Sequence, residues 1–238
     1  MRSTDHGILN GWNINAHFIA PNPSTALTPH SVSPFLHPSV YLGPFSSVIG
    51  DVTVEENVFI APNVSVRADE GTPFYIGAFS NLQDGVILHG LAHGRVTAGG
   101  RDYSIYIGDH VSCAHGCIIH GPCKLGSHVF VGFHAIVFNA IVDDGCYISM
   151  GALITGGVHL AYSRFVPPGA IIDTQQKADE LGRVPQSQVE FAHEVLEVNK
   201  AFPSSYSLSF GSTRCSCGLA CDAVLNGKPP TGVCSEET

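Results

Sequence analysis

Apolar residues return every six positions along the middle of this 238-residue chain, and that rhythm restricts the folds it can adopt. The clearest run places an aliphatic or small residue at each sixth position: Ile107, Cys113, Ile119, Leu125 and Val131. A second small or apolar residue follows four places after each of these: Val111, Cys117, Cys123, Val129 and Ala135. Hexapeptide repeats are typical of a parallel β-helix in which three hexads close one triangular coil. The sequence therefore predicts an all-β solenoid whose inward positions form the core.

The same spacing covers most of the first 172 residues. It begins at Leu42, breaks over 67–73, resumes at Ile76 and breaks again over 91–106, a stretch rich in Gly, His and Arg. After Val137 it slips by one residue and then continues. We therefore predict a β-helix domain over 37–172. Prolines keep the preceding residues extended, so we expect 1–36 to form an irregular N-terminal arm that packs on the solenoid or on a neighbouring subunit.

A different pattern follows the repeats. Residues 174–182 are a candidate for a short helix. Ser187 and Glu190 have the spacing of a capping box, and an apolar helical stripe follows them, which predicts a helix over about 187–202. We expect this C-terminal helical segment, 173–202, to pack along one face of the solenoid. The remaining residues, 203–238, are rich in Cys, Ser and Gly and are expected to form a loosely ordered tail.

Composition restricts the partners and the compartment. The net charge is −9 and only 13% of residues are charged, which argues against binding to nucleic acid or to an anionic membrane. The first residues lack the apolar region of a signal peptide, and no apolar run has membrane length, so we expect a cytoplasmic protein without a membrane partner. Four of the eight cysteines fall on inward hexad positions and are expected to be reduced and buried: Cys113, Cys117, Cys123 and Cys146.

Two histidines share one phase of the repeat. His89 follows Leu88, and His120 follows Ile119, so both are the second residue of their hexads. If the loop over 91–106 only bulges from a corner, they lie on one face in adjacent coils, with Cα atoms about 4.8 Å apart. Two imidazoles at that spacing can converge on one ion. His115 is the third residue of the preceding hexad and lies one face round the triangle.

This placement predicts a metal site shared between subunits. One chain offers a pair of ligands on one face and a single ligand at another edge, so three chains around a threefold axis would complete each site. The alternative is that these side chains are ordinary surface residues, because the chain has 13 histidines and some cluster by chance. We interpret His110, His128 and His134 in that way, as turn or face residues. The repeat alone leaves both interpretations open.

A family resemblance supports the metal interpretation. The segments 67–74, 81–90 and 114–122, which contain His89, His115 and His120, resemble the γ-class carbonic anhydrases at that family's spacing. The similarity runs over about 37–202 and is strongest to the carbonic-anhydrase-like domain of the carboxysome protein CcmM. It implies a left-handed β-helix, a homotrimer, and metal sites at subunit interfaces with these three histidines as ligands. Three imidazoles suit Zn²⁺, with Co²⁺ or Fe²⁺ as alternatives.

The resemblance also implies an activity, the reversible hydration of CO2 to bicarbonate by a metal-bound hydroxide. The other active-site positions of the family fall on five residues here. Arg67 and Asp84 would form an interface ion pair, and Gln83 would hydrogen-bond the metal-bound water. Glu70 would act in proton transfer and bicarbonate release, and Asn199 would line the pocket. Each also has a plainer interpretation, as an ion pair, a coil-stabilising amide, or a polar residue of a loop or helix.

One departure from the family concerns proton transfer. Ala92 stands where the best-studied members carry a shuttle glutamate, and His93 follows it, with an ordinary pKa near 6.5 that suits the task. Either His93 replaces the glutamate or Glu70 acts alone. In the tail, we hypothesise that Cys215 and Cys221 form a disulfide, with zinc binding or free thiols as alternatives.

Two other functions stay open at this point. A hexapeptide acyltransferase shares the fold but needs only one histidine, as a general base. A non-catalytic scaffold would instead bind carboxysome components, and the chain would then lie within a carboxysome-like microcompartment. CcmM proteins recruit Rubisco through extra repeats, and we expect that route to be absent because these 238 residues contain none.

Overall fold

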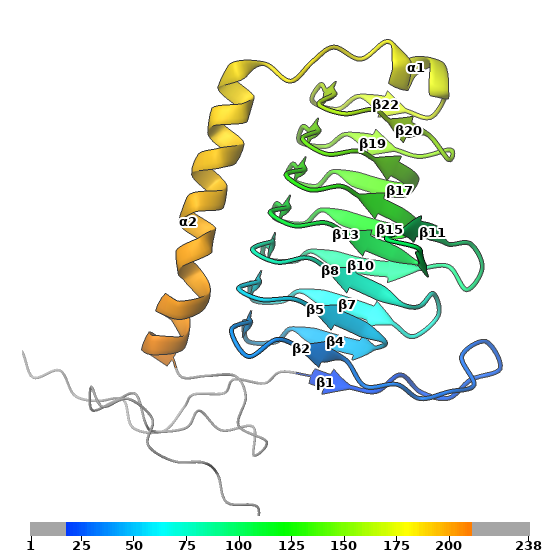
Figure 1. The fold of residues 1–238 in the computed structure, drawn as a ribbon, viewed down its shortest axis with the longest axis vertical. Coiled ribbons are helices and arrows are strands. Elements are labelled where there is room, and N and C mark those ends of the chain that lie inside the picture. The colour runs from blue at the N-terminus through cyan, green and yellow to red at the C-terminus, as the bar shows by residue number, and fades with distance from the viewer. Residues whose placement is uncertain (1–17, 211–238) are drawn as a thin grey trace, which may run out of the picture.

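A computed structural model of the chain, in which residues 18–210 are described, confirms a parallel β-solenoid followed by a helix. The strands stack in coils of three faces, and Figure 1 shows α2 running alongside the whole stack. Apart from the hairpin β11–β12, every strand pair in the described residues is parallel. Short strands and sharp corners follow directly from a repeat that changes direction every six residues.

Three faces make up the solenoid. The first holds β1 (Phe18–Ala20), β4 (Ser47–Gly50), β7 (Ser65–Ala68), β10 (Ile87–Gly90), β19 (Leu153–Ile154) and β22 (Ile171–Ile172). The second holds β2 (Phe35–Leu36), β5 (Val52–Val54), β8 (Phe74–Ile76), β13 (Ile105–Ile107) and β20 (His159–Leu160). The longer strands β15 (Ile118–Leu125) and β17 (Ile136–Val142) bend round the corner and belong to both. The third holds β3 (Tyr41–Leu42), β6 (Phe59–Ile60), β9 (Asn81–Leu82), β14 (Ser112–Cys113), β16 (Phe130–Val131), β18 (Tyr147–Ile148) and β21 (Phe165–Val166).

The inward residues stack in register from coil to coil. On the third face, Leu82 pairs with Cys113, which pairs with Val131 and then with Ile148, and all four are fully buried. Each inward side chain therefore contacts its equivalents in the coils on either side. Burying one aliphatic side chain in this way contributes about 1.5–3 kcal/mol to stability. The regular stack fixes the height and direction of every outward residue as well.

The predicted one-residue slip is visible between β15 and β17. Ile119 faces Val137 and Leu125 faces Val142, although Leu125 lies six positions after Ile119 on β15 and Val142 lies only five positions after Val137 on β17. The register shifts between His120 and Cys123 to absorb the difference. The core therefore stays continuous while the corner changes its length.

The N-terminal and loop segments contain structure that the repeat does not predict. β1 adds to β4 in parallel at the end of the first face, so residues 18–20 of the expected irregular arm are a strand. The loop over 91–106 carries an antiparallel hairpin, β11 (Val96–Ala98) and β12 (Arg101–Tyr103). Tyr103 of that hairpin packs its ring against Tyr75 and Tyr106 on the second face, which anchors the insertion.

The helical segment differs from prediction at its end. α1 (Gln175–Asp179) is capped by Thr174 and corresponds to the expected short helix. α2 (Gln186–Phe210) begins before Ser187, so Ser187 is not the capping residue. The Glu190 carboxylate instead accepts a hydrogen bond from the side-chain amide of Gln186. It also continues past residue 202 with Pro203 inside it. The expected end at 202 was wrong, because rings in the last turns pack on the solenoid and hold the helix together.

Those rings form an aromatic cluster between α2 and the first coils. Phe202 packs edge-on against Phe59 at 5.1 Å, and Tyr206 lies 5.1 Å from Tyr41 and 5.2 Å from Phe59. Aromatic pairs of this kind add about 0.5–1.5 kcal/mol each beyond the area they bury. In addition, Asn57 donates a hydrogen bond to the carbonyl of Lys200. These contacts fix the rotation of α2 over the third face.

The four core cysteines are free and buried, as predicted. The tail cysteines lie outside the described residues, and so does the hypothesis of a disulfide between Cys215 and Cys221. Neither helix of the described segment is long and apolar enough to cross a membrane.

A first prediction concerns the closeness of adjacent coils. A Cβ on Gly132 would lie 2.6 Å from the backbone nitrogen of Met150 in the next coil. We expect Gly132→Ala to lower the free energy of unfolding by about 1–3 kcal/mol, because backbone atoms of a packed coil must move. Gly182→Ala is the matched control, since nothing lies within 4 Å of its Cβ position. Urea denaturation of both variants checks this, and equal midpoints would contradict it.

A second prediction concerns the core thiols. Burial raises the pKa of Cys123 to about 12 and that of Cys146 to about 11, from an ordinary value of 9.0. With the tail cysteines replaced by serine, we expect the folded protein at pH 8 to be inert to a thiol reagent and the unfolded chain to expose four thiols. Above pH 9 unfolded thiols lose protons before folded ones, so the free energy of unfolding should fall with rising pH. Rapid labelling of the folded protein would contradict this.

Candidate metal centre

The predicted register of the two histidines is confirmed. β7, β10 and β15 are neighbours on the first face, and Arg67, His89 and His120 occupy equivalent places on them. The rings of His89 and His120 meet edge to face at 5.2 Å, and His89 Nδ1 lies 3.2 Å from His120 Nε2. Two nitrogens bound to one tetrahedral ion at 2.0–2.1 Å are about 3.3 Å apart. This pair therefore has the spacing of two metal ligands.

Oxygen acceptors occupy the other ring nitrogens of this pair. His89 Nε2 lies 3.2 Å from Asp69 Oδ1, and His120 Nδ1 donates to the carbonyl of Gly121 at 3.2 Å. Such partners fix the ring orientation and the tautomer, and leave the lone pair on the remaining nitrogen for a metal. Hence the facing nitrogens of His89 and His120 are the ones available to an ion.

Glu70 lies beside the same pair. Its Oε2 is 3.9 Å from His89 Nε2, and its Oε1 accepts a hydrogen bond from the backbone nitrogen of Ala92. The carboxylate is thus held between the imidazoles and the start of the 91–106 loop, where His93 is exposed. Arg67 pairs with Asp69 at 3.8 Å. This face carries a cation, two carboxylates and two imidazoles close together.

His115 lies at a corner of the solenoid, before the third face turns into the first. Its Nδ1 is 3.0 Å from Asp84 Oδ2, and its ring stacks on Phe133 at 5.7 Å. The side chain is 54% exposed. As in His89 and His120, one ring nitrogen of His115 has an oxygen partner, and the other is available to an ion. His115 therefore presents a single oriented ligand outward from the corner.

A buried amide network lies next to this corner. Gln83 Nε2 donates to Asn81 Oδ1 at 2.8 Å and to Asn199 Oδ1 at 2.7 Å. Asn81 Nδ2 in turn donates to Ser112 Oγ, and all four side chains are buried. The network joins the third face to α2. It holds the amide of Gln83 in one orientation, because both of its N–H groups have acceptors.

An open cavity of about 430 Å³ lies between this corner and α2. Gln83, Asp84, His115 and Asn199 all line it, and rings including Phe59, Phe133 and Phe191 form its apolar wall. The aromatic cluster at the end of α2 contributes Phe202 and Tyr206 to the same wall. A small, weakly polar substrate can thus approach the amides from a largely apolar space.

The eight predicted residues divide into two groups within one chain. Arg67, Glu70, His89 and His120 lie on the first face. Gln83, Asp84, His115 and Asn199 lie around the cavity beside α2. Over residues 18–210, no group of three His, Cys, Asp or Glu side chains is arranged to hold an ion. The expected pairing of Arg67 with Asp84 concerns a neighbouring subunit and stays a prediction.

Sequence reasoning gave no role to Asp69, Asn81 or Ser112. Gln83 directly follows β9 and lies two residues after Asn81, so the alternation of extended chain puts both side chains on one side, and Ser112 is in register with Asn81 one coil away. This spacing in the sequence could have predicted that Asn81 and Ser112 lie beside Gln83. Asp69 follows the end of β7, where the repeat breaks, so counting hexads could not place it.

Two kinds of known protein are similar to this chain in sequence. The chain is 44% identical over 190 residues to the carboxysome assembly protein CcmM of Nostoc sp., covering 79% of this chain and 34% of that protein. It is 37% identical over 176 residues to a carbonic anhydrase of Methanosarcina thermophila, covering 70% of this chain and 71% of that enzyme. The chain thus spans about a third of the length of its CcmM relatives.

Other comparisons speak only to the fold. A hexapeptide transferase family protein from Anaplasma phagocytophilum has a TM-score of 0.60 with 24% identity, covering 74% of this chain and 93% of that one. This likeness supports the solenoid architecture and carries no argument about activity. No family model matches the chain.

A prediction tests the amide network. Asn199→Ala removes one acceptor from the buried amide of Gln83, and we expect it to lower the free energy of unfolding by about 1–3 kcal/mol. Glu194→Ala, an exposed change on the same helix, is the control and should stay within about 0.5 kcal/mol. Denaturant titration followed by circular dichroism measures both. If the two variants unfold alike, the network does not hold α2.

Proposed function

The chain belongs to the γ-class carbonic anhydrase family, close to the domain found in CcmM, and on that premise we propose that it hydrates CO2 reversibly to bicarbonate. The sites would lie between the subunits of a homotrimer, each built from the two groups of residues described above. Relatives named as a carbonic anhydrase and as a carboxysome assembly protein support the activity and the setting respectively.

One observation carries the proposal. Each of the three histidines has one ring nitrogen beside an oxygen acceptor: Asp69 for His89, Gly121 O for His120, and Asp84 for His115. Imidazoles that serve as metal ligands are held in this manner, and the remaining nitrogens of His89 and His120 already have the required spacing. Zn²⁺ is the ion we favour, and Co²⁺ or Fe²⁺ suit the same ligands.

The ion, when bound, supplies Lewis acidity that lowers the pKa of water toward about 7. The protein must then orient CO2 and remove a proton. Gln83 and Asn199, fixed by their hydrogen bonds, face the apolar cavity and would orient the substrate and bicarbonate. Glu70 lies 3.9 Å from His89 and would accept the proton. From there, exposed His93 would carry the proton to solvent. Glu70 lies close to it, because its carboxylate accepts a hydrogen bond from the backbone nitrogen of Ala92, the residue before His93.

The surface beside the histidines favours a trimer. A stripe of outward aliphatic residues follows the first face coil by coil next to His89 and His120: Ile87, Ile118, Ile136, Leu153 and Ile171. Ile87 and Ile136 are 41% and 37% exposed in the single chain. Phe133 and Met150 are exposed at the corner that carries His115. Packing one chain's corner against the next chain's face would bury both surfaces, as in the left-handed trimers that the family resemblance implies.

A second candidate function is a structural one in a carboxysome-like microcompartment. The 44% identity to a carboxysome assembly protein favours it. In that case the solenoid would bind other carboxysome components, with or without catalysis. The two functions are separable, because assembly does not require the histidines to bind an ion.

The direct test measures metal content and CO2 hydration of the purified chain and two variants. We expect His89→Ala to lose the ion and to lower kcat/KM by at least about 10³-fold. His159→Ala, which removes a surface imidazole paired with Asp143, is the control and should retain both. Equal hydration rates in wild type and His89→Ala would overturn the catalytic proposal and leave the structural one.

A complementation prediction tests the shared site. His89→Ala and His115→Ala chains should each be inactive. After the two are unfolded and refolded together, about a quarter of the interfaces would join an intact His89 of one chain to an intact His115 of its neighbour. We therefore expect mixed trimers to recover up to about a quarter of wild-type metal and activity. A site formed within one chain would give no recovery, so an inactive mixture of correctly folded trimers would refute the interface.

A further inference from the structure

A ladder of aromatic rings follows the corner of the solenoid opposite His115. Phe79, His110 and His128 each precede a strand of the third face by two residues and so occupy equivalent places on successive coils. All three have left-handed backbones, with φ of 57°, 59° and 57°. Phe79 and His110 stack with centroids 5.3 Å apart, and His110 and His128 at 4.8 Å. The coil spacing itself thus matches the distance that stacked rings prefer.

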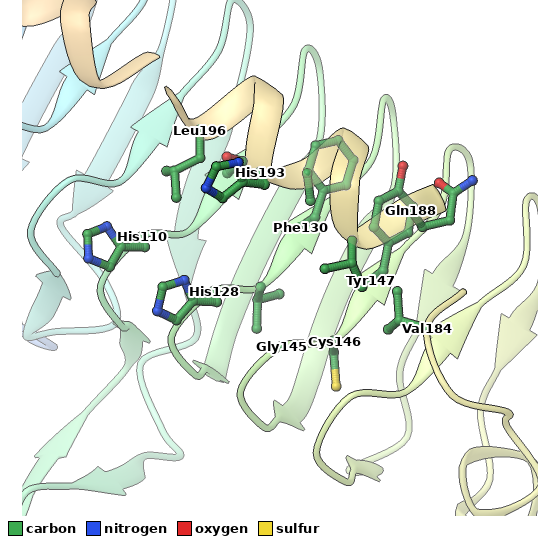
Figure 2. A pocket seen from close by; sticks show the side chains of 14 residues that line it. His110, His128, Phe130, Gly145, Cys146, Tyr147, Val184, Gln188, His193 and Leu196 are labelled. Atoms are coloured by element: carbon green, nitrogen blue, oxygen red, sulfur yellow. The ribbon is translucent and has the colours of Figure 1, made fainter. Parts of the chain in front are cut away.

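The ladder stops at the next coil. Gly145 occupies the equivalent place with φ of 67°, and it contributes no ring. His110, between two rings, is half-buried, whereas His128 is exposed. Figure 2 shows His110, His128 and Gly145 in sequence along the corner, with α2 passing above them. Residue 145 therefore adds no ring beyond the exposed His128, and the ladder ends there.

A cavity of about 230 Å³ opens at this point between α2 and the third face. Apolar side chains form most of its wall: Val129, Phe130, Tyr147, Val184, Val189, Ala192 and Leu196. Gln188 and His193 reach it from α2 (Figure 2). His193 stands at the exposed rim, 3.7 Å from Glu197. The cavity is separate from the proposed metal centre, although Ser112 and Phe130 border both cavities.

The charges around the cavity select for a neutral ligand. Among the described residues that line it there is no Asp, Glu, Lys or Arg. Burial lowers the pKa of His110, and the neighbouring His128 and Lys200 lower it further, which disfavours a charge on its ring. A charged molecule would lose its hydration here without gaining a partner of opposite charge. Gln188 both donates and accepts hydrogen bonds, which suits an amide or a similar polar group.

We propose that this cavity binds a planar aromatic molecule of one or two rings that carries a neutral hydrogen-bonding group. The ring lies over Gly145 and continues the stack on His128, and the polar group faces Gln188 and His193. The apolar wall accounts for most of the affinity, whereas stacking accounts for the preference for a flat ring. The proposal is independent of carbonic anhydrase activity and of a bound metal.

Two probe molecules of equal size test the stacking. Benzamide and cyclohexanecarboxamide have the same amide on a flat and a puckered ring, respectively. We expect the full-length protein to bind benzamide roughly three- to tenfold more tightly in calorimetric titrations, with NMR shifts at the imidazole of His128. Equal affinities, or no binding of benzamide up to its solubility, would overturn the proposal.

The chain itself suggests the matched variant. Gly145→His continues the ladder with its own ring, in a backbone conformation that His110 and His128 already adopt. A Cβ there would meet Tyr162 at 3.6 Å, an ordinary contact. We expect benzamide binding to weaken at least about tenfold while the unfolding midpoint stays or rises. If that variant does not fold, Ala192→Leu on the opposite wall should weaken binding instead. Undiminished binding in a folded variant would place the ligand elsewhere and refute the proposal.

Discussion

The in-register stacking of inward side chains is the interaction on which this structure depends. Each buried residue meets its equivalents at the spacing of hydrogen-bonded strands, so a coil can neither rotate nor slide without opening the core. Outward residues inherit the same precision. His89 and His120 are brought together by the aliphatic residues that precede them, Leu88 and Ile119, which pair directly behind them. The packing of the core therefore sets the spacing of the side chains on the surface.

That dependence explains which features the sequence could predict. The phase of His89 and His120 survived a long interruption, because the hexads on either side resume in step and the inserted hairpin leaves the coil at a corner. The four core cysteines were predictable for the same reason. Each of these inferences used only the position within a repeat, and the repeat is enforced by burial.

Features that depend on contacts between different elements were not predictable. The end of α2 was misjudged because Pro203 normally limits a helix, whereas here Phe202 and Tyr206 hold the last turns against Phe59. Asp69 was overlooked because it lies outside the repeat, and its meeting with His89 depends on how the chain turns after β7. Asn199 was named only through the family resemblance, because a helical stripe alone does not fix the rotation of α2 that brings it to Gln83.

The hairpin β11–β12 shows how such a scaffold can diversify. It enters between two coils, extends away from the stack and returns the chain without altering the pairing of β10 with β15. An insertion at this corner thus leaves the register of His89 and His120 unchanged, although the loop still contacts Glu70 through the backbone nitrogen of Ala92. Evolution could lengthen or shorten this loop, or change its charge, and so alter access to the proposed metal centre while the register of the two histidines is kept.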